Sequence, residues 1–127
     1  MLGAVALTGI TGALAALADT LHPAKTLAAG LAEDFNPAAS VLVHLRMGHP
    51  LVAVLVTGWL VYCSVERGEG VPGGIRKLVP LFAVGQLLTG LANIALLAPV
   101  GIQLLHLLLA NCLWVVLVTF VWYAKAE

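Results

Sequence analysis

The chain has 127 residues, of which 61% are hydrophobic and only 9% are charged, and its formal net charge is zero. A soluble domain needs roughly 25% charged residues to cover its surface, so the outer surface of this chain must largely face lipid. Its length favours a single domain, residues 1–127, and the balanced charge gives no indication of a nucleic-acid partner.

Four apolar segments follow one another along the chain, and each is near the ~20 residues that a helix needs to cross the hydrocarbon core. The first segment lacks the basic start of a signal peptide and three further spans follow it, so we interpret it as a true membrane helix. The predicted fold is therefore all-α, an integral membrane four-helix up-and-down bundle. The four segments are residues 1–18, 39–65, 78–98 and 100–124.

The three connections between these segments are polar or contain proline and glycine. In the first, residues 19–38, apolar residues follow Pro23 at helical spacing and predict a short helix at the membrane interface. The second, residues 66–77, reads "ERGEGVPGGIRK" and carries most of the remaining charge. The third, "APVG", predicts a tight turn between antiparallel helices. The residues that suggest the short helix are Ala24, Leu27, Ala28 and Leu31.

The basic residues indicate how the chain is oriented, because loops rich in lysine and arginine favour the cytoplasmic side. The second connection contains Arg67, Arg76 and Lys77. Lys125 follows the last segment, whereas the long first connection contains only Lys25. We therefore predict a cell-membrane protein with both termini and the second connection in the cytoplasm, and with the first connection outside.

Four histidines are distributed over these elements. His22 lies in the first connection, and His44 and His49 lie in the outer half of the second segment. His106 lies in the outer half of the fourth segment. The second and fourth segments are parallel and diagonal in an up-and-down bundle, so their histidines can meet at its centre. His44 and His49 are five residues apart and cannot both bind one centre.

The neighbouring residues favour His49 over His44 as the partner of His106. His49 and His106 are each followed four residues later by an alanine, which leaves room for a flat, bulky ligand against the helix. The preceding segments also share a short motif, Leu7-Thr8-Gly9 in the first and Leu88-Thr89-Gly90 in the third. The sequence therefore predicts two similar helical hairpins, each of which contributes one histidine.

Two histidines at this place in a membrane favour a shared ligand. A single one usually makes a hydrogen bond between helices, but ionisable groups are costly to bury there. Two imidazoles supply only two of the four ligands that a zinc site takes. They suffice for a haem, whose porphyrin supplies the other four ligands of the iron. We predict that His49 and His106 bind the iron of a haem b.

Two further side chains are candidates for contacts with this cofactor. Arg46 lies three residues before His49, on the same face and nearer the outside, where it could pair with a haem propionate or extend to the interface. Gln103 stands in the same relation to His106. Pro50 removes one helix hydrogen bond and is expected to bend the helix beside the site.

Three stretches of the chain resemble one four-helix half of haem A synthase: "ADTLHPAKTLAAGLAEDF", "LRMGHPLVA" and "LLAPVGIQLLHLLLANCLW". The similarity extends over nearly the whole chain. Members of that family usually carry two related four-helix bundles, of which one holds haem b and the other receives haem O, whose methyl group is oxidised to a formyl. The resemblance implies that His49 and His106 occupy the second-helix and fourth-helix ligand positions. His44 and His22 match no ligand position.

The chain also departs from the family pattern. It has half the usual length and one bundle, so we expect a homodimer that restores the two-bundle arrangement. Many members have an acidic residue just before the second-helix histidine, whereas Arg46 stands three residues before His49 here. Members often carry a cysteine pair in an external loop, and the first connection contains no cysteine.

Three functions are open at this point, and the sequence assigns no catalytic residue. The chain could be a haem-modifying enzyme of the haem A synthase type, acting on haem O in cytochrome oxidase assembly. It could be a small b-type cytochrome that passes electrons, for example from a quinol. It could also be a cofactor-free membrane scaffold or transporter whose histidines pack or relay protons.

Overall fold

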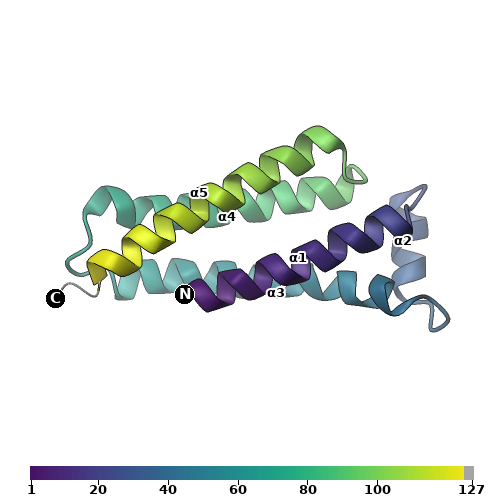
Figure 1. Ribbon diagram of the computed structural model, residues 1–127, viewed down its shortest axis with the longest axis horizontal. Coiled ribbons are helices and arrows are strands. Elements are labelled where there is room, and N and C mark those ends of the chain that lie inside the picture. Colours follow the sequence, from purple (N-terminus) through teal and green to yellow (C-terminus); the bar gives the residue numbers. More distant parts are fainter. Residues whose placement is uncertain (125–127) are drawn as a thin grey trace.

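The computed structural model describes residues 1–124, which form five helices and no strand (Figure 1). Four of these helices are long and apolar enough to cross a membrane, and this confirms the all-α membrane bundle expected from the sequence. Lys125, one of the basic residues used to orient the chain, lies outside the described residues. The helices are α1 (Leu2–Leu21), α2 (Leu27–Asp34), α3 (Val41–Glu66), α4 (Gly73–Ala95) and α5 (Val100–Ala124).

The helix boundaries differ from the apolar segments mainly in α4. This helix begins at Gly73, five residues before the apolar segment, because a helix can continue into the interface where its polar side chains reach water. It ends at Ala95, three residues earlier than expected. Leu97 and Ala98 have φ values of 56° and 55°, in the left-handed region that no α-helix of L-residues sustains. The chain then turns at Pro99 into α5.

The long helices form two antiparallel hairpins, α1 with α3 and α4 with α5 (Figure 1). The hairpins pack together mainly through α3 and α4, and α1 makes only a few contacts with α5. In this arrangement α3 and α5 are diagonal and run in the same direction, as the sequence predicted. The α3 helix is continuous through Pro50.

The buried side chains of the bundle gather in the half that contains the connection between α3 and α4. Met1, together with Leu2 and Val5 of α1, packs against the same cluster. By contrast, no residue in the ranges 44–59, 84–98 and 100–112 is fully buried. The core that joins the two hairpins therefore lies toward the connection between α3 and α4, whereas at the opposite end only Ala18, Gly30 and Val43 are buried among residues 1–124. The core residues are Leu60, Val71, Val79, Ala83, Leu113, Leu117 and Phe120.

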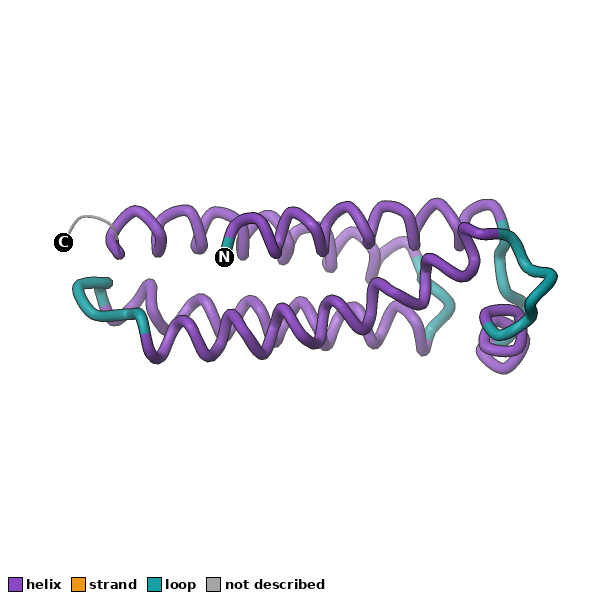
Figure 2. Tube along the Cα trace, turned by 90° about the horizontal axis from the view of Figure 1, so that it is seen from below, coloured by secondary structure: helices purple, strands orange, loops and turns teal. Residues whose placement is uncertain are grey.

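The short helix α2 lies across the end of the bundle opposite the connection between α3 and α4, here called the outer end. Figure 2 shows it end-on while the four long helices run horizontally. Thr26 caps its first turn, because its Oγ1 accepts a hydrogen bond of 3.1 Å from the backbone N–H of Ala29. The helix expected after Pro23 is thus confirmed, although it begins at Leu27 rather than at Ala24. Its crosswise orientation is the one that an interfacial helix adopts.

Candidate functional site

His49 projects from α3 toward α1. Its Nδ1 lies 3.1 Å from Oγ1 of Thr11, and the Thr11 hydroxyl donates its hydrogen to the carbonyl oxygen of Thr8 at 2.9 Å. Because a hydroxyl has a single hydrogen, Thr11 must accept the N–H of His49. The His49 proton is therefore on Nδ1, and the lone pair of its Nε2 is left for another partner.

His106 makes the matching contact between α5 and α4. Its Nδ1 lies 2.9 Å from Oγ1 of Thr89, whose hydroxyl lies within hydrogen-bonding distance of the carbonyl oxygens of Gly85 and Gln86, at 3.1 and 3.0 Å. By the same reasoning the proton of His106 is on Nδ1. In contrast to His49, the Nε2 of His106 has a protein partner, because the amide Nε2 of Gln86 lies 3.1 Å away.

A glycine beside each threonine leaves room for the imidazole ring. A Cβ atom added to Gly12 would lie 3.0 Å from Cε1 of His49, and one added to Gly90 would lie 3.2 Å from Cε1 of His106. Both distances are shorter than ordinary van der Waals contact. Each histidine ring therefore lies directly on the backbone of the neighbouring helix, and the two hairpins hold their rings with the same Thr-Gly pair.

The internal repeat expected from the sequence exists, but in a different register. The structure matches Thr11-Gly12, rather than Thr8-Gly9, with Thr89-Gly90. The first helix contains both pairs, and the sequence comparison favoured the earlier one because a leucine precedes it. A Cβ atom added to Gly9 would meet nothing within 4 Å, so Gly9 faces away from the ring of His49.

The four histidines fall into two groups. His49 and His106 come from the diagonal helices α3 and α5, and each contacts the neighbouring helix of its own hairpin. The other two lie at the outer end of the bundle. Nε2 of His44 is 3.0 Å from the carbonyl oxygen of Asn36, and Nε2 of His22 is 3.2 Å from Oγ of Ser40. Neither belongs to the site that the sequence predicted.

Arg46 binds three acidic side chains at the outer end of the bundle. Its Nε lies 2.7 Å from Oδ1 of Asp34, and its Nη1 lies 3.0 Å from Oδ1 of Asp19. Its Nη2 lies 3.3 Å from the carbonyl oxygen of Gly30 and 3.9 Å from a carboxylate oxygen of Glu33. The guanidinium thus connects α2 to α1 and α3, a role that the sequence reasoning missed. Its pairing with a haem propionate stays a prediction, and the propionate would have to compete with these carboxylates.

Gln103 is held at the turn that precedes α5. Its amide Nε2 donates a hydrogen bond to the carbonyl oxygen of Ala98, and its side chain is exposed. The structure shows no bond between Gln103 and His106. Its role beside a cofactor stays a prediction, whereas its contact with the left-handed residue Ala98 supports the turn.

Sequence reasoning also missed the polar face of α4. Gln86, Thr89 and Asn93 follow one another at intervals of three and four residues, which places them on one side of the helix. The amide oxygens of Gln86 and Asn93 are buried and have no hydrogen-bond partner within residues 1–124. Buried acceptors without partners are rare and costly. Their spacing around Thr89 is the pattern that could have identified this face from the sequence.

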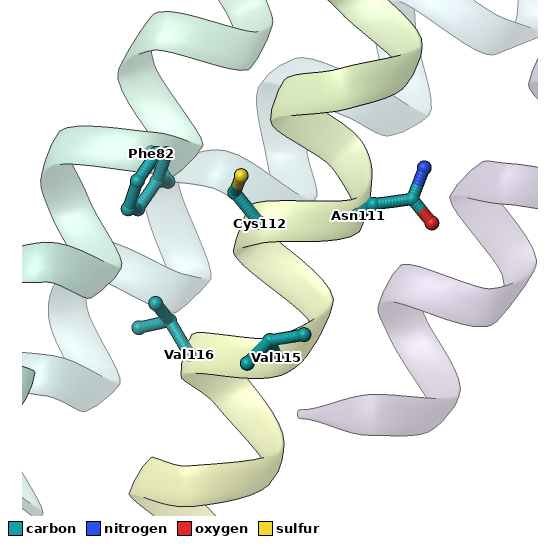
Figure 3. A pocket seen from close by; sticks show the side chains of 5 residues that line it. All are labelled: Phe82, Asn111, Cys112, Val115 and Val116. Atoms are coloured by element: carbon teal, nitrogen blue, oxygen red, sulfur yellow. The ribbon is translucent and has the colours of Figure 1, made fainter.

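The remaining candidate space is a shallow, open apolar depression of about 330 Å³ on the surface beside α5. Figure 3 shows the sulphur of Cys112 between α5 and Phe82, and Asn111 on the other side of the helix. The Asn111 amide donates to the carbonyl oxygen of Leu107 in its own helix. Cys63 and Cys112 are free thiols. Val115 and Val116 complete the lining, which is almost entirely apolar.

The donor set of the described residues restricts the metals that could bind. Within residues 1–124 no group of three or more histidine, cysteine or acidic side chains is arranged to hold a metal ion. A pair of imidazoles, each with a fixed proton on Nδ1, instead suits a metal that brings its own further ligands.

Comparison with known proteins gives two results. The model of the COX15-CtaA family, described as cytochrome oxidase assembly protein, matches residues 1–118. Protoheme IX farnesyltransferases from two strains of Thermus thermophilus are each 40% identical over 114 residues, which is 87% of this chain and 19% of theirs. The chain therefore spans about a fifth of the length of these curated relatives. No solved structure matches.

Proposed function

Since the chain belongs to the COX15-CtaA family of cytochrome oxidase assembly proteins, the family of haem A synthase, we propose that it is a membrane haem b-binding redox protein that corresponds to one half of that enzyme. In this proposal His49 and His106 would hold a haem by binding its iron. The observation that carries it is the matched placement of the two histidines, each on a Thr-Gly pair of the neighbouring helix.

The hydrogen bonds of the two rings are those that a haem ligand needs. Histidines that bind metals almost always donate their second N–H to a fixed acceptor, which sets the tautomer and makes the ligand more basic. Thr11 and Thr89 are such acceptors for the Nδ1 protons of His49 and His106. The coordinating lone pair is then on Nε2 in both rings. A haem held there supplies an iron that changes between two oxidation states.

The outer half of the bundle offers an environment that fits such a group. His49 and His106 are half-buried and lie in ranges, 44–59, 84–98 and 100–112, that contain no fully buried side chain, so no tightly packed core surrounds the two rings. The unpartnered amide oxygens of Gln86 and Asn93 are further support, since a buried acceptor favours a polar ligand or water beside it.

The comparisons favour a role in haem modification over an unrelated membrane function. The relatives are named for the transfer of a farnesyl group to protohaem IX. A farnesylated haem is the compound that haem A synthase oxidises, so we propose haem O as the substrate of the assembled protein. Electron transfer, for example from a quinol, is the second function, because an iron with two histidine ligands has no open position for oxygen.

The proposal includes an orientation and an assembly. The basic residues of the connection between α3 and α4 favour a cytoplasmic location for this end and for both termini. The histidines then lie in the external half of the membrane. We further propose that two copies associate, so that a cofactor haem and a substrate haem each have one bundle.

An absorption spectrum of the purified protein tests haem binding. We expect a low-spin b-type spectrum, which His49→Ala or His106→Ala abolishes or converts to high spin because an axial ligand is lost. His44→Ala and His22→Ala are the controls and should leave the spectrum nearly intact, since both residues are bonded at the outer end of the bundle. A spectrum lost with His44→Ala and retained with His49→Ala would disprove the ligand assignment.

A second measurement separates the enzyme from the cytochrome. The membrane protein is supplied with haem O, and the haem is extracted and analysed by mass spectrometry. Formation of a formyl derivative supports a haem-modifying enzyme. Unchanged haem O together with reduction of the bound haem by a quinol supports electron transfer.

A further inference from the structure

The hydrogen bonds of the two candidate ligands differ at one atom. His49 and His106 both place their proton on Nδ1, but only the Nε2 of His106 is bound by another side chain, the amide of Gln86 at 3.1 Å. An amide nitrogen is a donor only, so the Gln86 N–H points into the lone pair with which His106 would bind a metal. Within residues 1–124 no side chain makes the corresponding contact with Nε2 of His49.

The orientation of the Gln86 amide is consistent with the rest of the network. The chain of donors runs from the Gln86 amide to Nε2 of His106, from Nδ1 of His106 to Thr89, and from the single hydrogen of the Thr89 hydroxyl to the backbone carbonyl of Gly85 or Gln86. Reversing the amide would break this chain, because Thr89 would have to donate to His106 and give up its backbone bond. It would also bury an NH₂ group without an acceptor.

Gln86 is also the residue that breaks the symmetry between the two hairpins. When the two hairpins are aligned so that Thr11 matches Thr89, Thr8 of α1 occupies the position equivalent to Gln86 of α4. The Thr8 hydroxyl donates to the carbonyl oxygen of Ala4 in its own helix and is not bonded to His49. One hairpin thus presents a histidine with a free lone pair, and the other presents a histidine whose lone pair is already occupied.

We propose that Gln86 is a positioning residue that competes with the haem iron for Nε2 of His106, so that His49 is the permanent ligand and His106 the exchangeable one. This inference rests on the proposed haem binding. With a haem bound, the Gln86 amide would stabilise His106 in the position where its Nε2 accepts this hydrogen bond, and would thereby weaken the binding of His106 to the iron. A net hydrogen bond between neutral groups changes such an equilibrium by about 2- to 10-fold.

The first test uses the haem-free protein and does not depend on haem binding. Imidazole ¹⁵N NMR of the full chain with labelled histidine should show Nδ1–H tautomers for His49 and His106 and two different Nε2 resonances, because only His106 accepts a hydrogen bond. Gln86→Leu removes the donor and should move the His106 resonance toward that of His49. Asn111→Leu, which removes an amide bonded only within α5, should change neither. Equal Nε2 resonances in the wild-type protein would overturn the proposal.

The second test uses the haem-loaded protein. Carbon monoxide can bind the ferrous iron only after His106 has left, so Gln86→Leu should slow its binding by about 2- to 10-fold and decrease any high-spin fraction. Gln86→Met, which keeps the length of the side chain without a donor, repeats the measurement if the leucine variant does not fold. Unchanged rates in variants that retain haem overturn this inference and leave the proposed function intact. A chain that binds no haem in any variant overturns the proposed function itself.

Discussion

At the scale of single residues, the site depends on how closely an imidazole can approach a helix backbone. The rings of His49 and His106 lie against Gly12 and Gly90, where a Cβ atom would come within 3.0 and 3.2 Å of a ring carbon. Any larger side chain must move the ring, and with it the hydrogen bond from Nδ1 to the threonine. Positions 12 and 90 therefore require a small residue because the histidine ring needs the space, and not because the helix backbone needs a glycine.

We predict that Gly12→Val or Gly90→Val weakens haem binding by about tenfold or more, the range typical for loss of the groups that orient a metal-binding histidine. Gly58→Val in α3 is the matched control, because nothing lies within 4 Å of a Cβ at this position. Titration of the haem-free proteins with haem, followed by absorption, measures the affinities. Equal affinities for Gly12→Val and Gly58→Val would show that the ring of His49 does not lie where the structure has it.

At the scale of helices, a cluster of charged side chains holds the outer end of the bundle together, in addition to the buried Ala18 and Val43. The guanidinium of Arg46 and the carboxylate of Asp34 are only 10% and 11% exposed and lie 2.7 Å apart. This pair, with the contacts to Asp19 and Glu33, fixes the crosswise helix α2 to α1 and α3. Without the cation, three carboxylates would be left close together.

We therefore predict that Arg46→Gln releases α2, at a cost of about 1.5–3 kcal/mol, as expected for a hydrogen bond to a charged group. Hydrogen exchange of the α2 amides in the purified protein measures the effect, which should be an increase in exchange of the short helix while α5 is unchanged. Lys25→Gln is the control, since Lys25 lies in the same connection and makes no ion pair within residues 1–124. Unaltered exchange of α2 in Arg46→Gln would contradict the role given to this cluster.

At the scale of the whole molecule, one side of α1 is free of the rest of the bundle. Gly12 is covered by His49, but a Cβ at Gly3 or Gly9 would meet nothing within 4 Å. Helices associate in lipid through small residues that let their backbones approach closely. Of the two glycines near the middle of this helix, Gly12 packs within the bundle, whereas Gly9 is open and available to a second copy.

We predict that the protein purified in mild detergent has the mass of two chains of 13.2 kDa after correction for bound detergent. Gly9→Leu should shift this mass toward one chain, because a large side chain keeps the two backbones apart, and should leave the haem spectrum unchanged. Gly58→Leu, on another open position, should not affect the mass. A monomer that retains haem in mild detergent or nanodiscs would rule out the dimer.

The orientation in the membrane is a second property of the whole molecule. We predict that a cysteine at Ala38 reacts with an impermeant thiol reagent added to intact cells, whereas a cysteine at Glu69 reacts only after permeabilisation. Glu69 is chosen rather than its neighbour Gly70, because Gly70 has a φ of 75° and a cysteine side chain there would be strained. The opposite labelling pattern would place the histidines in the cytoplasmic half of the membrane.

The sequence by itself determined the membrane spans, the short helix after Pro23, and the diagonal placement of His49 and His106. These features depend on local properties, because the bilayer sets the length of an apolar helix and short connections make successive helices antiparallel. The bundle, the two hairpins and the separation of these histidines from His44 and His22 agree with the prediction.

Only the tertiary structure decided how each helix is rotated about its axis, and therefore which side chains meet. It selected Thr11-Gly12 as the partner of His49, placed Gln86 on His106, gave Arg46 three acidic partners, and held Gln103 at a turn. In a soluble protein the apolar stripe of a helix reveals its inner face. These helices are apolar on all sides because they face lipid, so the spacing of apolar residues does not reveal which side of a helix faces inward. Contacts between distant residues fix the rotation of each helix instead.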